Sequence, residues 1–291
     1  MTILRPNLPR AVADRPVLVI VGHGSPHTAE SGHATIATAV SIARQGRYRA
    51  VPALMKGEPS LPRVLHSLPE GSRVFVVPHF AGDGVFATDH IPTAVAAASS
   101  HLAEARVLPA LGGSRRVIDR TAALLTGLTD STGGIPDLLV VGHGSSAGGD
   151  TSAEAMAFAL GGSLHCGAAH AAFLERAPTL AEALDRLPLG PDVLMSVLLA
   201  ARGKHACKDV PDALGLPHGS PLSGPDGSPR GPIAVGGRRL WLHAPLTDIR
   251  LMTDAAVELA EQVRLQGDGA AMSHPVARPL DHNQGGFAAT A

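Results

Sequence analysis

Short apolar runs alternate along the chain with segments whose apolar residues recur at helical spacing. The run Pro16–Val21 stops at Gly-His-Gly-Ser, and the following segment Ala29–Arg44 has the spacing of a helix. Uninterrupted apolar runs bounded by glycine are typical of strands buried on both faces, and their alternation with helices predicts a parallel sheet with right-handed crossovers. The further elements expected in this half are strands at Tyr48–Met55, Arg73–Pro78 and Arg106–Pro109, and helices at Pro59–Leu68, Ile91–Leu102 and Ser114–Leu128.

The same pattern then begins again. After a Gly/Pro boundary at Ser131–Pro136, the run Asp137–Val141 also stops at Gly-His-Gly-Ser, so that His143 follows His23 by 120 positions. RVFVVPHFAGDGVF (73–86) parallels DVLMSVLLAARGKH (192–205), and ALMKGEPSL (53–61) parallels AAFLERAPTL (171–180). Three landmarks in the same order at nearly constant offset indicate an internal duplication. We therefore expect two α/β lobes, over residues 15–130 and 136–266.

The second half carries extra segments near its end. Residues 215–231 are rich in Pro, Gly and Ser and predict a linker or surface loop inside this lobe, and Ile233–Leu242 predicts a strand or a hairpin around Gly236-Gly237. Thr247–Gln266 has helical spacing, and we expect it to close the second lobe. Residues 267–291 are polar and Gly-rich, which predicts a disordered tail.

Composition narrows the class of protein. A net charge of -1 without a basic run argues against nucleic-acid or membrane binding. Two cysteines, Cys166 and Cys207, make neither a disulfide framework nor an iron–sulfur site. The chain has no apolar stretch suited to a signal peptide or a membrane span, so we expect a soluble cytoplasmic protein, a monomer or weak homodimer. The chain has 15 histidines, so their positions relative to the predicted strands are of interest.

Three histidines follow predicted strands. Ligand crevices of parallel α/β sheets lie at the carboxyl ends of the strands, where His23, His143 and His205 are all expected. If the strands before His143 and His205 are neighbours, the two imidazoles face one crevice. Such a pair suits a divalent ion such as Co²⁺, Fe²⁺, Ni²⁺ or Zn²⁺, and neutral imidazoles also accept protons near neutral pH. A single histidine at a strand end is more often a hydrogen-bonding or capping residue.

Other side chains near these strand ends have two interpretations each. Glu175 is the best carboxylate to complete a site and Glu58 its looser counterpart in the first half, yet either fits a solvated acid at a helix start. Ser25 and Ser145 suit either a helix cap or a substrate contact. Cys207 suits either a soft metal ligand or a small packing residue.

Several motifs together resemble a known family. They are VIVGHGS and LVVGHGS, then GEPSL and RAPTL, and finally GKHACKDVP (203–211), which is similar to the family pattern Gly-x-His-x-x-x-Asp-Ile-Pro. Over Pro16–Leu214 the chain resembles the CbiX/SirB-type sirohydrochlorin chelatases, the class II tetrapyrrole chelatases. These insert Co²⁺ or Fe²⁺ into sirohydrochlorin for cobalamin or sirohaem synthesis. The resemblance implies two flavodoxin-like lobes with the tetrapyrrole in the cleft between them.

The two halves do not match this pattern equally. In GVFATDHIP (84–92), Phe86 stands where the second histidine belongs and His90 stands where the aspartate belongs. We therefore expect a degenerate site in the first lobe, with His79 a further substitute, and the metal site in the second lobe, as in the protohaem ferrochelatases. Glu175 also lies one residue nearer Pro178 than the family pattern predicts.

The resemblance assigns roles to these residues. His143 and His205 would receive the metal substrate, Co²⁺ or Fe²⁺ with Ni²⁺ also suitable, and one of them or Glu175 would accept the pyrrole protons. The residues implied on the substrate side are His23, Ser25, Ser145, Phe86 and His79, with Lys56, Arg202 and Lys204 near the substrate carboxylates. The alternatives are a non-catalytic metallochaperone or tetrapyrrole carrier on the same fold, and a chelatase for another macrocycle.

Overall fold

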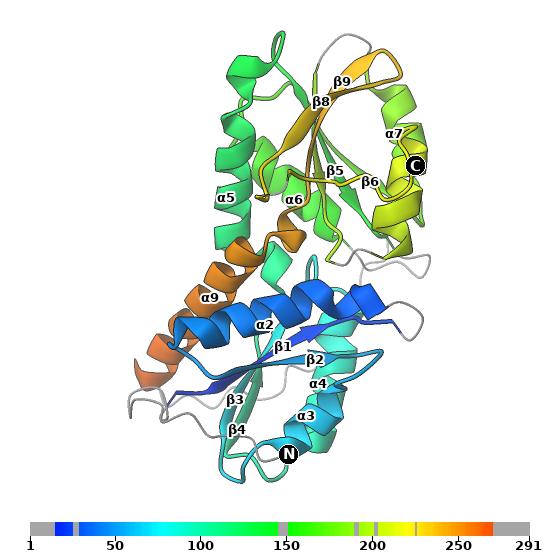
Figure 1. Cartoon of the computed structure of the whole chain (residues 1–291). Coiled ribbons are helices and arrows are strands. Elements are labelled where there is room, and N and C mark those ends of the chain that lie inside the picture. Colours follow the sequence, from blue (N-terminus) through cyan, green and yellow to red (C-terminus); the bar gives the residue numbers. More distant parts are fainter. Residues whose placement is uncertain are drawn as a thin grey trace, which may run out of the picture.

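The computed structural model describes residues 15–25, 29–144, 151–188, 192–200, 203–224 and 226–269. It has two α/β lobes, each a sheet with helices on both faces (Figure 1). The sheet of the first lobe has the order β2-β1-β3-β4 and all its pairs are parallel. The sheet of the second lobe has the order β6-β5-β7-β9-β8, and only the β8–β9 pair is antiparallel. The predicted duplicated parallel-sheet fold is confirmed.

The helices and strands predicted for the first lobe are present in the structure. Some of them begin or end at other residues than predicted, because contacts with other segments set their ends. Predicted helix Ile91–Leu102 ends at Ala98, because the chain turns back there and the His101 carbonyl accepts from the Gly71 amide. The fourth strand starts two residues early, at Glu104, which pairs with Arg73 of the neighbouring strand. The elements are β1 (Val17–Gly22), α2 (His33–Gln45), β2 (Ala50–Leu54), α3 (Leu61–Ser67), β3 (Arg73–Pro78), α4 (Ile91–Ala98), β4 (Glu104–Val107) and α5 (Arg115–Thr126).

The second lobe repeats this order and adds a hairpin. Gly236 and Gly237 turn between β8 and β9 with φ of 54° and 76°, values that favour glycine. β8 begins at Arg230, inside the predicted linker 215–231, because its residues pair with β9. The elements are β5 (Asp137–Gly142), α6 (Ser152–Gly161), β6 (Ala169–Phe173), α7 (Leu180–Arg186), β7 (Val193–Val197), α8 (Val210–Ala213), β8 (Arg230–Val235), β9 (Arg238–His243) and α9 (Ile249–Gly269).

Most of the predicted disordered tail, residues 270–291, lies outside the described part of the chain. Among the helices of the described residues, none has the length and apolar character needed to cross a membrane.

The apolar strand runs are explained by burial on both faces of each sheet. In β1, Leu18 and Ile20 face a core that both lobes share, while Val17, Val19 and Val21 face a separate core beneath α3 and α4. Successive side chains of a strand point to opposite faces, so a strand covered on both sides must be apolar at every position.

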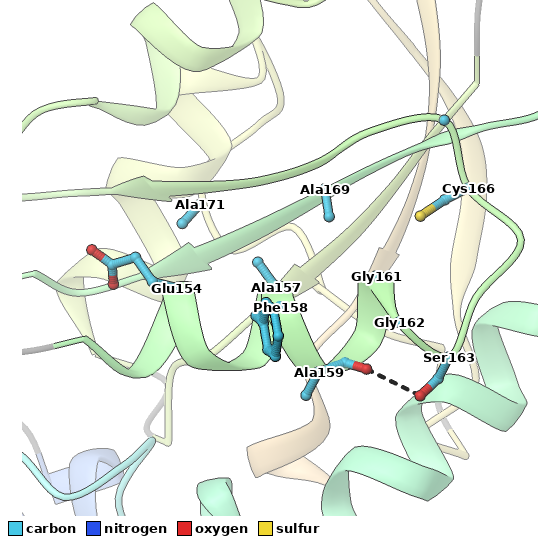
Figure 2. Close-up of a pocket in the computed structure, with 11 residues that line it drawn as sticks. Glu154, Ala157, Phe158, Ala159, Gly161, Gly162, Ser163, Cys166, Ala169 and Ala171 are labelled. Carbon is cyan, nitrogen blue, oxygen red and sulfur yellow. Dashed lines mark hydrogen bonds between the residues drawn. The ribbon is translucent and has the colours of Figure 1, made fainter.

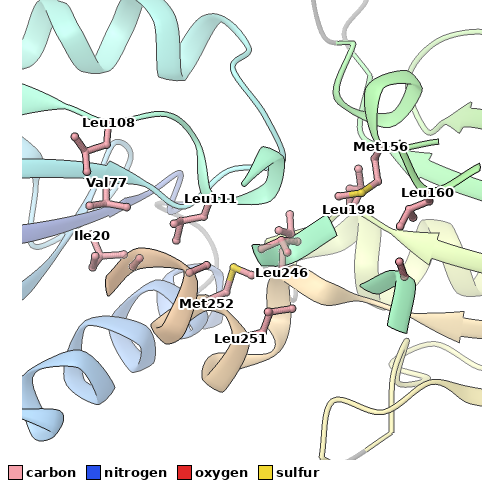
Figure 3. Packing of buried hydrophobic residues seen from close by; sticks show 14 of the residues in the cluster. Ile20, Val77, Leu108, Leu111, Met156, Leu160, Leu198, Leu246, Leu251 and Met252 are labelled. Carbon is pink, nitrogen blue, oxygen red and sulfur yellow. The ribbon is translucent and has the colours of Figure 1, made fainter. Parts of the chain in front are cut away.

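The last helix of each half packs against the other half. α9 contacts α2 of the first lobe, whereas α5 contacts α6 of the second lobe (Figure 1). Figure 3 shows the resulting shared core, in which Ile20 and Val77 of the first lobe lie in one cluster with Met156 and Met252. The helix expected to close the second lobe therefore packs against helices of the first half, and its buried residues join the cluster that holds Leu18 and Ile20 of β1.

A buried histidine adds a polar contact between the two halves of the chain. His79, at the end of β3, is fully buried, and its Nε2 lies 3.0 Å from the carbonyl oxygen of Leu246, just before α9. Its Nδ1 lies 3.3 Å from the hydroxyl of Thr35 in α2. A neutral ring donates to the carbonyl and accepts from the hydroxyl. Burial lowers the pKa of His79 to about 4, so the ring stays neutral near pH 7.

We expect truncation of the shared core to destabilise both lobes together. Met252, on α9, is fully buried, so Met252→Ala should cost about 2–5 kcal/mol of unfolding free energy. Leu265, on the same helix but 63% exposed, is the control, and Leu265→Ala should change stability by less than about 0.5 kcal/mol. Urea unfolding can be followed at the single tyrosine, Tyr48 of the first lobe, and at the single tryptophan, Trp241 of the second. Separate midpoints for the two probes would contradict a shared core.

We also expect His79 to make folding sensitive to acid. Its folded pKa of about 4 lies below the model-peptide value of 6.5, so the unfolded chain binds more protons between these two values. The stabilisation is complete above pH 6.5 and is lost as pH falls towards 4, by about 3 kcal/mol. His79→Gln should therefore show a shallower loss of stability between about pH 7 and about pH 5, measured by urea unfolding. Parallel losses in both proteins would argue against this role.

Candidate metal centre

Three adjacent strands bring His143, Glu175 and His205 to one edge of the second sheet. β5 ends just before His143 and pairs with both β6 and β7. His205 opens a π-helical turn after β7, labelled η5 (His205–Asp209). Glu175, two residues after β6, donates its amide to the His143 carbonyl at 3.0 Å. The strands before His143 and His205 are thus neighbours, the condition for a shared crevice.

The second glycine of each Gly-His-Gly-Ser motif has a backbone role. Gly144 has φ of 75° and Gly24 has φ of 70°, the left-handed region that favours glycine. A Cβ at Gly24 would lie 2.3 Å from the carbonyl oxygen of Lys56. These glycines let the chain turn sharply after each histidine while remaining against the neighbouring loop.

The ligand atoms of the three side chains converge. The Nε2 atoms of His143 and His205 lie 3.0 Å apart. Oε1 of Glu175 lies 3.7 Å from the first and 3.5 Å from the second. A divalent ion bound at about 2.0–2.2 Å to each ligand needs ligand separations of about 3.3–3.5 Å. The group therefore fits one metal ion, with small adjustments of the side chains.

Hydrogen bonds on the far side of each ring orient the inner nitrogens. Nδ1 of His143 lies 2.6 Å from the Gly144 carbonyl oxygen, and Nδ1 of His205 lies 2.7 Å from Oδ2 of Asp209. Both partners only accept, so each Nδ1 carries the proton. In the neutral rings both Nε2 lone pairs then point at the same small volume. A shared cation or proton there would relieve their repulsion, so this geometry favours a cation between the two rings.

Asp209 was not among the site residues predicted from the sequence. Two features of the sequence could have identified it. Asp209 lies four residues after His205, on the same side of a helical turn, and it is the aspartate of GKHACKDVP. It also pairs with Lys204, whose Nζ lies 3.6 Å from Oδ2.

The centre is accessible from solvent. The side chains of His143 and Glu175 are both 45% exposed, and that of His205 is 26% exposed. Partial exposure allows an ion to arrive and to leave, unlike in a closed structural site.

The first lobe has different residues at the equivalent positions. The Lys56 amide donates to the His23 carbonyl at 2.7 Å, just as the Glu175 amide donates to that of His143. Lys56 is therefore the counterpart of Glu175, and the expectation that Glu58 takes this place is wrong. Glu58 is exposed and accepts from the Ser60 amide.

Aromatic contacts replace ligation in the first lobe. Phe86 and His90 lie in the π-helical turn η2 (Phe86–His90), the counterpart of η5. The Phe86 ring lies edge-on to His23 with centroids 4.7 Å apart, and 4.9 Å from His90. Among the described residues, three or more metal-ligating side chains converge only at His143, Glu175 and His205.

The pKa of His23 in the first lobe lies below its ordinary value. Burial is the main cause that lowers the pKa of His23, and the charges of Lys56 and His143 lower it further. His23 and Phe86, which the family resemblance implies in a wall of the substrate pocket, contact each other in the first lobe, with ring centroids 4.7 Å apart.

Several predicted site residues are not part of this group. His79 is buried in the shared core with both nitrogens engaged, so it does not line the cleft. Cys207 is half-buried on η5 and does not join the ligand atoms. Ser25 follows Gly24 at the same edge of the first sheet, whereas Ser145 and Arg202 lie outside the described residues.

A separate hollow of about 670 Å³ lies on the outside of the second lobe, between α6 and the edge strand β6 (Figure 2). It includes none of the three converging residues. Its metal-ligating side chains, Glu154 and Cys166, lie at opposite ends of it in Figure 2, and Glu154 pairs with Arg176. The hollow is therefore not a metal site.

Comparison with solved structures finds the same fold in chelatases. CbiX, described as the terminal enzyme of sirohaem biosynthesis in denitrifying bacteria, is 23% identical, with a TM-score of 0.61 over 89% of this chain and 100% of that one. SirB from Bacillus subtilis with Fe³⁺ is 14% identical, with a TM-score of 0.63 over 88% and 98%. A multidomain chelatase-like protein of Deinococcus radiodurans is 22% identical, with a TM-score of 0.60 over 84% of this chain. The chain spans only 54% of that protein, which has two additional domains.

Sequence comparison gives the family. No curated protein matches the sequence. The CbiX family model matches twice, at residues 17–126 and again at 137–263, once for each half of the duplication. Because these two matches cover most of the chain and coincide with the two lobes, the chain belongs to the CbiX family.

Proposed function

We propose that this protein inserts a divalent metal ion, Co²⁺ or Fe²⁺, into sirohydrochlorin or a closely related tetrapyrrole. The observation that carries the proposal is the convergence of two Nε2 lone pairs and one carboxylate at a solvent-accessible edge of the second sheet. Family membership supports it. So do the names of two structural neighbours, a CbiX of sirohaem biosynthesis and a SirB with Fe³⁺. Imidazole and carboxylate ligands suit cobalt and iron alike.

The geometry suggests how the ion would be held and transferred. His143 and His205 would bind the incoming ion through Nε2, with Glu175 as a third ligand. Three protein ligands would leave coordination positions of the ion open. Pyrrole nitrogens can occupy these positions first and then displace the protein ligands one at a time. Insertion releases two pyrrole N–H protons for each ion. Glu175 and the freed imidazoles lie within reach to accept those protons.

Removal of one ligand should abolish insertion. We expect His143→Ala to lower the rate of Co²⁺ insertion into sirohydrochlorin by at least about 100-fold, because ligation and proton acceptance are both impaired. His165→Ala, a change at an exposed histidine of the same lobe, is the control and should keep the wild-type rate. The absorbance change of the macrocycle measures the rate. If wild type binds Co²⁺ stoichiometrically but inserts it no faster than buffer, the protein is a metal or tetrapyrrole carrier instead.

Asp209 should act as a positioning residue. Asp209→Asn retains the size of the side chain but weakens the acceptor that holds Nδ1–H of His205. We expect Co²⁺ affinity to fall by about 10- to 100-fold, the usual effect of losing a carboxylate behind a ligating histidine. Isothermal titration with Co²⁺ measures this directly, and the unfolding midpoint checks that the fold is intact. Unchanged metal affinity in a folded variant would show that Asp209 does not position His205.

A further inference from the structure

A hollow of about 380 Å³ lies at the amino ends of the first-lobe strands, the edge of the first sheet opposite to His23. β1 lies between β2 and β3, so the residues at the start of these three parallel strands meet there. Three arginines line the hollow for this reason: Arg15 just before β1, Arg49 just before β2 and Arg73 at the start of β3. The hollow therefore gathers guanidinium groups from three separate segments of the chain.

One carboxylate on α9 is shared by three arginines at this edge. Glu261 pairs with Arg15, with Arg47 at 3.2 Å and with Arg264 at 3.0 Å. The guanidinium group of Arg15 also lies 5.1 Å from the centroid of the Tyr48 ring, a cation–π distance. These contacts hold Arg15 in place, but a single negative charge cannot balance three positive ones.

The other side of the hollow has the same excess of positive charge. Glu104 is shared by Arg73 at 2.9 Å and Arg106 at 3.2 Å. Arg49 is exposed, and none of the ion pairs within the described residues includes it. Of the described residues that line the hollow, only Glu70 is acidic, and it is exposed and also outside those ion pairs.

The charges around this edge favour a multivalent anion. Six arginines are set against three glutamates, which leaves an excess of three positive charges on a chain whose net charge is -1. Neighbouring guanidinium groups repel one another, and an anion placed among them removes that repulsion. Guanidinium groups also match the paired oxygens of phosphates and carboxylates, to which they donate two parallel hydrogen bonds.

We propose that this hollow binds a small oxyanion with two or more negative charges, of the phosphate or carboxylate type, through Arg15, Arg49 and Arg73. The site lies at the other edge of the first sheet from the histidine motif, so it is independent of the proposed metal chemistry. Because Arg15 also pairs with Glu261 of α9, the bound anion adds a contact where the second half of the chain meets the first. Binding should therefore stabilise the folded protein.

The test titrates two anions separately into the full chain. Inorganic pyrophosphate and citrate are added at constant ionic strength to wild type, Arg49→Gln and Arg49→Glu, with calorimetry and the unfolding temperature as readouts. The control is Arg63→Gln, which removes an exposed arginine of α3 that pairs with Glu58 and does not line the hollow. We expect Arg49→Gln to weaken anion binding by about 10-fold and Arg49→Glu to weaken it further. Arg63→Gln should keep the wild-type affinity.

The outcomes separate a built site from a general effect of salt. Tighter binding of pyrophosphate supports a phosphate-type ligand, and tighter binding of citrate supports a carboxylate-type one. An equal rise of the unfolding temperature in wild type and Arg49→Glu would overturn the site, and so would the absence of binding by both anions at millimolar concentration. The unfolding temperature without anions checks that each variant is folded, and Co²⁺ affinity should be the same in all of them.

Discussion

Two imidazole nitrogens that point their lone pairs at each other are the constraint on which this site depends. Nε2 of His143 and Nε2 of His205 lie 3.0 Å apart because a carbonyl and a carboxylate hold the proton on the far side of each ring. Neutral rings in this geometry repel each other, and a cation between them removes the repulsion. The hydrogen bonds behind the rings therefore matter as much to cation binding as the ligand atoms themselves.

The sheet and the shared core keep this geometry in place. β5 lies between β6 and β7, so the residues that follow these three strands must meet at one edge. The exchange of α5 and α9 joins the two lobes through one apolar cluster and through the bond from His79 to the carbonyl of Leu246. The relative placement of the two lobes is therefore fixed by buried contacts between them, in addition to the covalent connection of the chain.

Duplication followed by divergence accounts for the asymmetry of the cleft. Both lobes retain the sharp turn after the first strand, because Gly24 and Gly144 adopt left-handed backbone conformations that favour glycine. What changed are the side chains displayed around that turn. Side chains able to hold a metal ion converge in the second lobe, while Lys56 and Phe86 place a positive charge and a ring at the equivalent positions of the first.

The sequence by itself determined the duplication, the parallel sheets and which lobe retains paired histidines, because these follow from local apolar runs and repeated motifs. It also predicted Glu175 near the pair. The tertiary structure decided matters that depend on contacts between distant segments. Only packing shows that α9 lies against the first lobe and that His79 is buried, since both depend on which apolar surface lies opposite. The equivalence of Lys56 and Glu175 follows from both levels, since each lies three residues before the proline of its repeated motif and each donates its amide to the carbonyl of the preceding histidine.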